Sequence, residues 1–406
     1  MMSVQETPKP TKKSANPPAA AASVKMHVVA VEDVAALQRH VPAWENLAAA
    51  AVEPNAFYEP WMLLPALKHF ATGPKPFFVL VYEPDANHPD SPGSLLGFFP
   101  LQRQGRYKGL PLPHLQLWRH LHSVLATPLI RAGYGHATLR AVFEWLRTEK
   151  RGSGLLKLDF VSADGPFHQL LVNHLNEETR LTFVEETTTR ALLRVSDDAE
   201  EYVKSTMSGG NRKELRRQRR RLGELGQLES RVLHQSDDAE KWIDQFLQLE
   251  ASGWKGQHGT ALRDHESEGD FFRTIAREAF ARGRLMMLGL FLDGQPIALK
   301  CNFLMGEGSI AFKIAFDEDY ARFSPGVQLE LDNIAEAHAR VGLRWMDSCA
   351  ISRHFMINRL WKERRVMQNV LVATGRRGGD LVVSALPLLR WLQRLVRRKP
   401  PSGEST

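Results

Sequence analysis

The sequence predicts an α/β (α+β) protein made of two similar halves, each a mixed, mostly antiparallel sheet flanked by helices. Two observations lead to this fold class. Both halves run through the same order of helices, hairpin strands, a helix and a further strand. In the second half, a long helical stretch separates the strands expected at 309–316 and 343–346. A crossover of that length implies that these two strands pair in parallel.

The first half is expected to span residues 26–195, after a tail at 1–25 whose Pro, Ala, Lys and Ser content predicts disorder. Apolar runs predict strands at 26–31, 77–82, 95–102, 127–131 and 155–161. Apolar residues at helical spacing predict helices at 34–50, 60–70, 136–150 and 167–178. Two further β-like stretches, 181–185 and 188–195, close this half.

The second half is expected to span residues 196–380, and residues 381–406 to form a basic helix and tail. Helices are predicted after the caps Asp197-Asp198 and Asp237-Asp238, and at 211–225 and 271–282. Asp293-Gly294 between two apolar runs predicts a hairpin of strands at 285–292 and 296–305. In the crossover helix one stripe should face the sheet and Gly342 should end the helix; the stripe is Val327, Leu331, Ile334, His338 and Val341.

The composition excludes several classes of protein. No run approaches 18 uninterrupted apolar residues, so no membrane-spanning helix is predicted, and residues 1–25 lack the apolar core of a signal peptide. Cys301 and Cys349 are too few to staple 406 residues, so we expect two reduced, buried thiols and a cytoplasmic location. No Cys/His spacing fits a zinc site, and no metal is expected. The net charge of +7 favours anionic ligands.

The segment Ser324-Pro325-Gly326 carries the strongest functional signal. Ser324 suits a helix N-cap, and Pro325 suits the first helical position, where its missing N–H costs nothing. Gly326 would leave the helix start bare, and exposed N–H groups there attract phosphates. We therefore predict a nucleotide-like cofactor with its diphosphate on this loop; the predicted binding residues are Phe316, Ser324, Pro325, Gly326, Val327 and Gln328.

Five segments in order resemble one known family. They are Asn211 to Arg217, Leu249 to Gly256, Asp293 to Ala298, Lys313 to Tyr320, and Ser324-Pro325-Gly326. They are similar to the GNAT acyltransferase fold, and more specifically to large bacterial acetyltransferases that look like Fem-type peptidoglycan aminoacyltransferases. Some of those relatives accompany cellulose or exopolysaccharide biosynthesis. The resemblance implies tandem GNAT-like domains with acetyl-CoA, or another acyl-CoA, bound by the second.

The same resemblance implies roles for residues around the loop. Asp317 is the first choice of base, His354 is a second candidate near neutral pH, and Tyr320 would protonate the leaving thiolate. Four residues are expected to contact the acceptor: Trp254, Lys255, Lys313 and Asp347. The loop has one glycine where ordinary GNAT members have a longer glycine-rich loop.

Three functions remain open at this point. The first is an acyl-CoA-dependent N- or O-acyltransferase acting on a sugar-like or small acceptor. The second is a Fem-like aminoacyltransferase, for which the basic run 211–221 would bind tRNA. The third is an inactive GNAT-like binding subunit. From Leu388 onward a basic amphipathic helix is predicted, which suits either docking on the domain or contact with a membrane surface. Gly133-Tyr134-Gly135 is either a plain turn or a second cofactor loop.

Overall fold

The structure is a computed structural model that describes residues 26–84, 92–253, 256 and 258–397. The tail predicted at 1–25 lies outside the described residues, as do Trp254, Lys255 and the segment 398–406.

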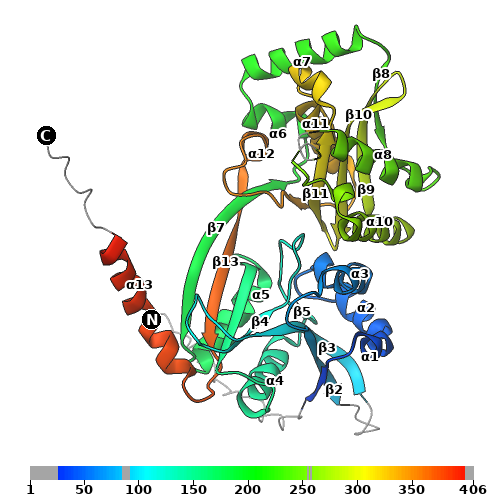
Figure 1. Cartoon of the computed structure of the whole chain (residues 1–406). Coiled ribbons are helices and arrows are strands. Elements are labelled where there is room, and N and C mark those ends of the chain that lie inside the picture. Colours follow the sequence, from blue (N-terminus) through cyan, green and yellow to red (C-terminus); the bar gives the residue numbers. More distant parts are fainter. Residues whose placement is uncertain (1–25, 85–91, 254–255, 257, 398–406) are drawn as a thin grey trace, which may run out of the picture.

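The amino-terminal half contains a meander, a crossover helix and a long final strand (Figure 1). Its strands are β1 (His27–Val31), β2 (Phe77–Pro84), β3 (Pro92–Gln104), β4 (His114–Leu117), β5 (Leu129–Ile130), β6 (Leu155–Ser162) and β7 (Thr182–Arg194). Its helices are α1 (Val34–Leu37), η1 (Gln38–His40), α2 (Val41–Ala49), η2 (Ala56–Tyr58), α3 (Pro60–Phe70), α4 (Gly135–Thr148) and α5 (Pro166–Glu177).

The carboxyl-terminal half repeats that order after two additional helices. Its strands are β8 (Leu228–Val232), β9 (Leu285–Leu292), β10 (Gln295–Met305), β11 (Gly308–Phe316), β12 (Trp345–Asp347) and β13 (Glu363–Ala373). Its helices are α6 (Ala199–Thr206), α7 (Gly209–Gly223), α8 (Ala239–Ser252), η3 (Leu262–Asp264), α10 (Glu266–Ala281), η4 (Glu318–Phe323), α11 (Pro325–Ala339), α12 (Ile357–Leu360) and α13 (Gly379–Arg397).

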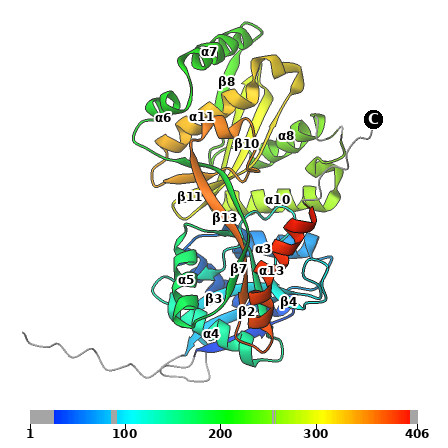
Figure 2. The ribbon, with the colours of Figure 1, turned by 90° about the vertical axis from the view of Figure 1, so that its left-hand side faces the viewer.

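The described strands form one continuous sheet that crosses both halves. Its order is β1-β2-β3-β4-β6-β13-β7-β12-β11-β10-β9-β8, with β5 paired to β3. The long strand β7 pairs with β13 on one side and, at its end, with β12 on the other. The last strand of the chain, β13, therefore lies inside the sheet of the amino-terminal half, and Figures 1 and 2 show β7 and β13 as the twisted pair that joins the halves.

Helices cover both faces of the sheet in the carboxyl-terminal half. On one face α11 packs over Met286, Leu288, Leu290 and Ile297. On the other, α8 and α10 pack over Met287, Leu299, Cys301 and Phe303, and this core continues into the amino-terminal half. There Phe70 of α3 meets Phe271 of α10 edge to face, with ring centroids 4.9 Å apart. The halves thus share one core.

Most of the predicted elements are confirmed, including the fold class, α3, the β9–β10 hairpin and the parallel β11–β12 pair. The single helix predicted at 34–50 is wrong, because it breaks at η1 and restarts with Pro42 in the first turn of α2. The two stretches at 181–185 and 188–195 form one strand, β7. Strands β4, β8 and β13 were not predicted.

The predicted sheet-facing stripe of α11 is only partly right. Ile334 is buried, and Val327 and Leu331 are partly buried, but the helix ends at Ala339 and Val341 is fully exposed. Beyond Pro325 and Gly326, the buried positions are Gln328, Leu329, Glu330, Asn333, Ile334 and Ala337. Three of these six are polar, so hydrophobic periodicity pointed to a different face of the helix.

A buried cluster of four charged residues lies where the two halves meet. One carboxylate oxygen of Asp347 accepts from Arg190 at 2.6 Å and from Arg365 at 3.0 Å. Arg365 also pairs with Glu53 at 2.9 Å and donates to the Ser162 hydroxyl. Burial acts to raise the pKa of Asp347, but Arg190 and Arg365 outweigh it and hold that pKa below its usual range. The cluster joins the loop after α2 to β7, β12 and β13.

Both cysteines are free thiols, and Cys301 is fully buried in β10, where burial raises its pKa. Among the described helices, none is both long enough and apolar enough to pass through a membrane.

We predict that Asp347→Asn lowers the free energy of unfolding by about 3–5 kcal/mol at pH 7, because it leaves two buried guanidinium groups without their shared counter-charge. Since the folded-state pKa of Asp347 is depressed, the stability it provides is present above its unfolded pKa, about 4, and is lost as pH falls below that value. Urea unfolding of wild type and variant at pH 7 and in acid measures both effects.

Glu240→Gln is the matched control, because it removes a carboxylate from an exposed pair with Arg277. We expect a loss below about 1 kcal/mol there. An equal loss in both variants, or an Asp347→Asn effect that does not shrink in acid, would contradict the assignment.

Candidate functional site

The start of α11 has the predicted position but a different local geometry. Pro325 is the first helical residue, and Ser324 is the N-cap with a left-handed backbone, φ 54° and ψ 50°. The Ser324 side chain makes no capping hydrogen bond, and this residue lines a pocket. Gly326 is buried under Phe316, and a Cβ at Gly326 would lie 3.3 Å from that ring. The glycine therefore allows close packing, and the helix start is open only on the side of Ser324 and Val327.

The first-turn amides are partly occupied within the helix. The N–H groups of Val327 and Gln328 both donate to the Ser324 carbonyl at 3.0 Å. The Gln328 side chain is buried and donates to the Leu215 carbonyl of α7 at 2.8 Å, so it ties α7 to α11. An anion at this helix start would thus depend on nearby side chains as well as on the backbone.

A pocket of about 600 Å³ opens beside this helix start. We call it the helix-start pocket; α6, α7, α11 and α12 border it, and Figure 1 shows these four helices at the same end of the carboxyl-terminal half. Three cations line it, namely Arg359, Lys362 and Arg364. Arg364 donates to the carbonyls of Trp361 and Asn358, whereas Arg359 is exposed. Phe355, which is 75% exposed, also lines the pocket.

Beside the pocket, β11 and β12 separate. They pair in parallel over Gly308 to Ile310 only, the last pair being Ile310 with Asp347. β11 continues to Phe316 without β12 beside it. The β10–β11 register shifts between Cys301 and Asn302, so Phe312 is an extra residue in β11. The split leaves backbone groups of β11 without a strand partner on that side.

A buried polar network holds α11 on the sheet next to this split. Lys300 of β10 and Glu330 of α11 form an ion pair at 2.8 Å, with both side chains buried. Glu330 also accepts from Asn333 and from the Trp361 indole N–H, at 2.9 and 3.0 Å. Asn302 donates to Asn333 at 2.9 Å. These bonds fix the direction in which the start of α11 points.

The predicted catalytic residues lie near the split but have local partners. Asp317 accepts from the Asp319 N–H at 3.0 Å and caps η4. Tyr320 packs, partly buried, against the core under α11. His354 stacks on Phe355, and burial, then Lys300, lowers its pKa. The roles of all three stay predictions.

Two of the predicted acceptor-binding residues can be placed. Asp347 has no exposed surface, and its carboxylate is bound to two arginines. In this structure its side chain therefore has no surface that an acceptor could contact. Lys313 lies 3.8 Å from the buried Glu250 of α8, with a fifth of its side chain exposed. Lys313 therefore lies on the α8 face of the sheet.

An aromatic cluster with two histidines, which sequence reasoning missed, joins the halves at this face. His120 and His122 follow β4 and lie among Phe70, Phe271 and Phe312. The His122 Nε2 atom is 2.9 Å from Glu268 of α10. His120 is 5% exposed, neither of its ring nitrogens has a hydrogen-bond partner, and burial, then His122 and Arg119, lowers its pKa to about 3. His122 thus approaches Phe312, the extra residue of β11, from the other half.

The corresponding place in the amino-terminal half is filled by protein. Strands β4 and β6 pair in parallel over two residues and then part. The segment after β4 occupies the gap, since Tyr58 donates to the Trp118 carbonyl and the Ala126 N–H to Phe160. The start of α4 is covered too, because a Cβ at Gly135 would lie 2.6 Å from Leu170. This supports the plain-turn interpretation of Gly133-Tyr134-Gly135.

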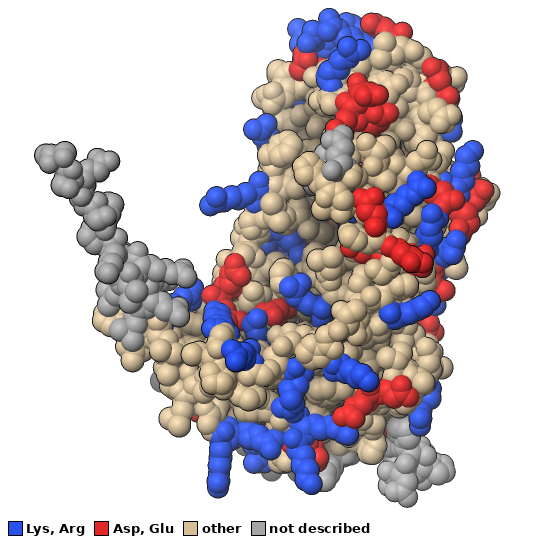
Figure 3. All heavy atoms as spheres, in the orientation of Figure 1, with Lys and Arg blue, Asp and Glu red and all other residues tan. Residues whose placement is uncertain are grey.

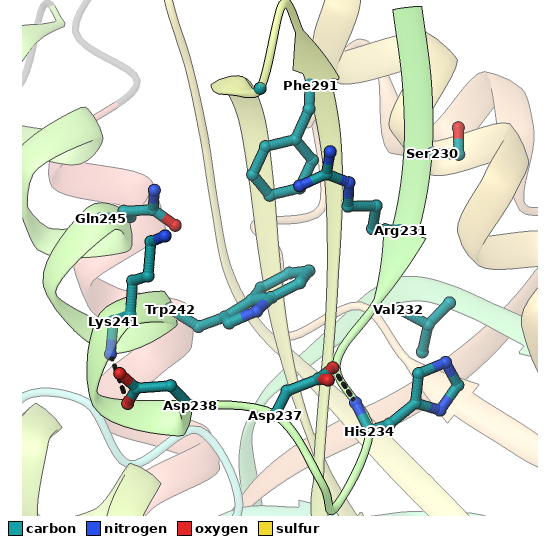
Figure 4. A pocket seen from close by; sticks show the side chains of 11 residues that line it. Ser230, Arg231, Val232, His234, Asp237, Asp238, Lys241, Trp242, Gln245 and Phe291 are labelled. Carbon is teal, nitrogen blue, oxygen red and sulfur yellow. Dashed lines mark hydrogen bonds between the residues drawn. The ribbon is translucent and has the colours of Figure 1, made fainter.

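A second hollow, of about 670 Å³, lies between β8 and α8 (Figure 4). Three of its charged side chains are engaged locally. Asp237 and Asp238 accept from the His234 and Lys241 backbone N–H groups, at 2.8 and 3.2 Å. Arg231 stacks on Phe291, 4.6 Å from the ring centroid. We assign no ligand to this hollow. Among the residues described, no three His, Cys, Asp or Glu side chains come together as a metal site.

Comparison with known proteins identifies the segment that carries this site. Residues 209–355 match a family model described as Acetyltransferase (GNAT) domain. This segment is therefore similar to GNAT acetyltransferase domains. It includes α7, the split strands and the start of α11.

Solved structures extend the likeness of fold to most of the chain. FemX is similar with a TM-score of 0.53 at 10% identity, covering 82% of this chain and 95% of that one. A conserved protein of unknown function from Bacteroides thetaiotaomicron has a TM-score of 0.50 at 10% identity, covering 85% of this chain and 99% of that one. No curated protein sequence matches. The matched segment and the preceding half thus share an overall fold with FemX.

Proposed function

We propose that the chain is an acyltransferase that moves an acetyl or other acyl group from acyl-CoA to an amine or hydroxyl of a sugar-like or small acceptor. The observation that carries the proposal is the parting of β11 and β12 beside a cation-lined pocket at the start of α11. The match of 209–355 to a GNAT domain supports the same reaction type.

The helix-start pocket suits the nucleotide end of a coenzyme. Arg359 and Lys362 would pair with phosphates, and the Ser324 hydroxyl would donate to one of them. The exposed ring of Phe355 would stack on the adenine. The pantetheine arm would then run along β11 into the split, which places the thioester near Phe312.

The reaction needs one proton to leave the acceptor and one to reach the departing sulfur. The acceptor nitrogen or oxygen attacks the thioester carbon, a base takes its proton, and the C–S bond breaks as the carbonyl re-forms. Asp317 and His354 are the bases suggested by sequence. The structure adds His122, whose Nε2 atom lies 2.9 Å from Glu268 and whose ring contacts Phe312. Tyr320 is the proposed donor of a proton to the thiolate.

The second candidate is transfer from an aminoacyl-tRNA, which the basic helix α7 favours. Lys and Arg gather over α7 in Figure 3. Arg217, Arg219 and Arg220 are paired with Glu214, Asp332 and Glu224. Lys213, Arg216 and Arg221 remain exposed along the helix, as phosphate contacts require. tRNA binding that weakens steeply with salt, without binding of acetyl-CoA, would select this candidate.

We expect acetyl-CoA to bind the wild-type chain and Arg359→Glu to weaken that binding by about tenfold to a hundredfold, the range for losing one charge-assisted hydrogen bond. Gly326→Glu should also weaken binding, because a side chain at this position would clash with the Phe316 ring and disturb the start of α11. Isothermal titration calorimetry measures both effects.

Arg340→Glu is the matched control, since it makes the same charge change at the far end of α11. Circular dichroism checks that Gly326→Glu still folds, because that position is tightly packed against Phe316. If Arg359→Glu and Arg340→Glu bind acetyl-CoA equally well, the pocket assignment fails.

A second prediction concerns the base. We expect His122→Asn to lower kcat by about a hundredfold or more, as loss of a general base does, and to remove the acidic limb of the pH–rate profile. Release of free CoA thiol in the presence of a panel of amines and sugars measures the rate. Acetyl-CoA affinity should stay unchanged.

Asp317→Asn and His354→Gln are assayed beside it. If one of these variants retains full turnover across the pH range, the residue that it replaces is not the base. Glu268→Gln should give a smaller loss than His122→Asn, because it removes only the group that orients the imidazole.

A further inference from the structure

The helix α13 is attached to the protein along one side only. Val383 and Leu386 are buried against Leu155, Leu371 and Ala373. Arg390 donates to the Val184 carbonyl of β7 at 3.2 Å and lies over the Phe183 ring. Figures 1 and 2 show the helix at the outer edge of the β7–β13 pair, with its final turns pointing away from the body of the molecule.

The opposite side of α13 is apolar and open to solvent. Leu381 is 78% exposed, Leu388 58% and Trp391 56%. Leu381 and Leu388 are seven residues apart and so share one face of the helix, and Trp391 lies one turn beyond Leu388. An amphipathic helix that merely docks on its own domain buries its larger apolar side chains, whereas here these are the exposed ones.

The segment that contains this helix is strongly basic. Residues 376–397 contain five arginines and a single acidic residue, Asp380. Their net charge of +4 is more than half of the +7 carried by the whole chain. A surface that is both apolar and negatively charged would complement such a helix. Two copies of α13 packed together would instead bring arginines of like charge side by side.

We propose that α13 is a membrane-docking helix that lies on anionic lipid bilayers. Leu381, Leu388 and Trp391 would enter the boundary between headgroups and acyl chains, and the exposed Arg377 would pair with a lipid phosphate. A single amphipathic segment of this kind gives reversible, peripheral binding. The proposal is independent of the acyltransfer chemistry, since α13 lies on the amino-terminal half, away from the helix-start pocket.

Vesicle co-sedimentation of the full chain tests the proposal. We expect binding to vesicles of phosphatidylcholine mixed with phosphatidylglycerol, weaker binding to phosphatidylcholine alone, and loss of affinity as salt rises. The double variant Leu388→Ser/Trp391→Ser should lose about tenfold or more, because two large side chains no longer leave water. Arg377→Gln, at an exposed arginine, should cost about fivefold on the mixed vesicles.

Val341→Ser is the matched control, because Val341 is a fully exposed apolar residue on the other half. It should bind as wild type does. Since the substituted side chains of α13 are exposed, the fold is expected to survive, and circular dichroism checks this. Equal vesicle binding by the double variant and wild type would overturn the proposal. So would no binding to either vesicle, or a concentration-dependent dimer that the double variant abolishes.

Discussion

The buried charge cluster of Glu53, Arg190, Asp347 and Arg365 is the constraint on which the rest of the structure depends. Each residue comes from a different segment, and two of them sit on the strands that join the halves. Asp347 is also the last residue of β12 that pairs with β11. The cluster therefore fixes the point at which those strands part, so the proposed donor slot depends on charges supplied partly by the other half.

A second buried network, centred on Lys300 and Glu330, fixes the position of α11 on the sheet. Burying Lys300 and Glu330 costs desolvation, and a well-packed apolar pair would stabilise the fold as well or better. What the ion pair adds is direction, because Glu330 must meet Lys300, Asn333 and the Trp361 indole at once. Trp361 leads from α12 into β13, so the same bonds place Arg359 and Lys362 beside the start of α11.

The sequence predicted what depends on near neighbours and missed what depends on distant partners. The β9–β10 turn, the limits of α3 and the Ser324-Pro325 helix start follow from local chemistry, and all are where they were expected. Strand β13 begins with three charged residues, a pattern typical of an exposed segment. Arg365 is nevertheless buried, because it pairs with Glu53, which is 312 positions away in the sequence. For the same reason the stripe of α11 was partly misplaced, and the pocket cations and His122, which reach the site from elsewhere, were not found.

The two halves complete the sheet with strands from each other's part of the chain. Strand β7 of the amino-terminal half completes the sheet beside β12, and β13, made last, completes the sheet beside β6. The sheet is complete in either half only when β13 is in place, which makes folding dependent on contacts of long sequence separation. In the amino-terminal half the segment after β4 fills the corresponding split. This half therefore supports the other one structurally. It holds β12 through Arg190 and places His122 beside Phe312, so both halves would contribute to the proposed site.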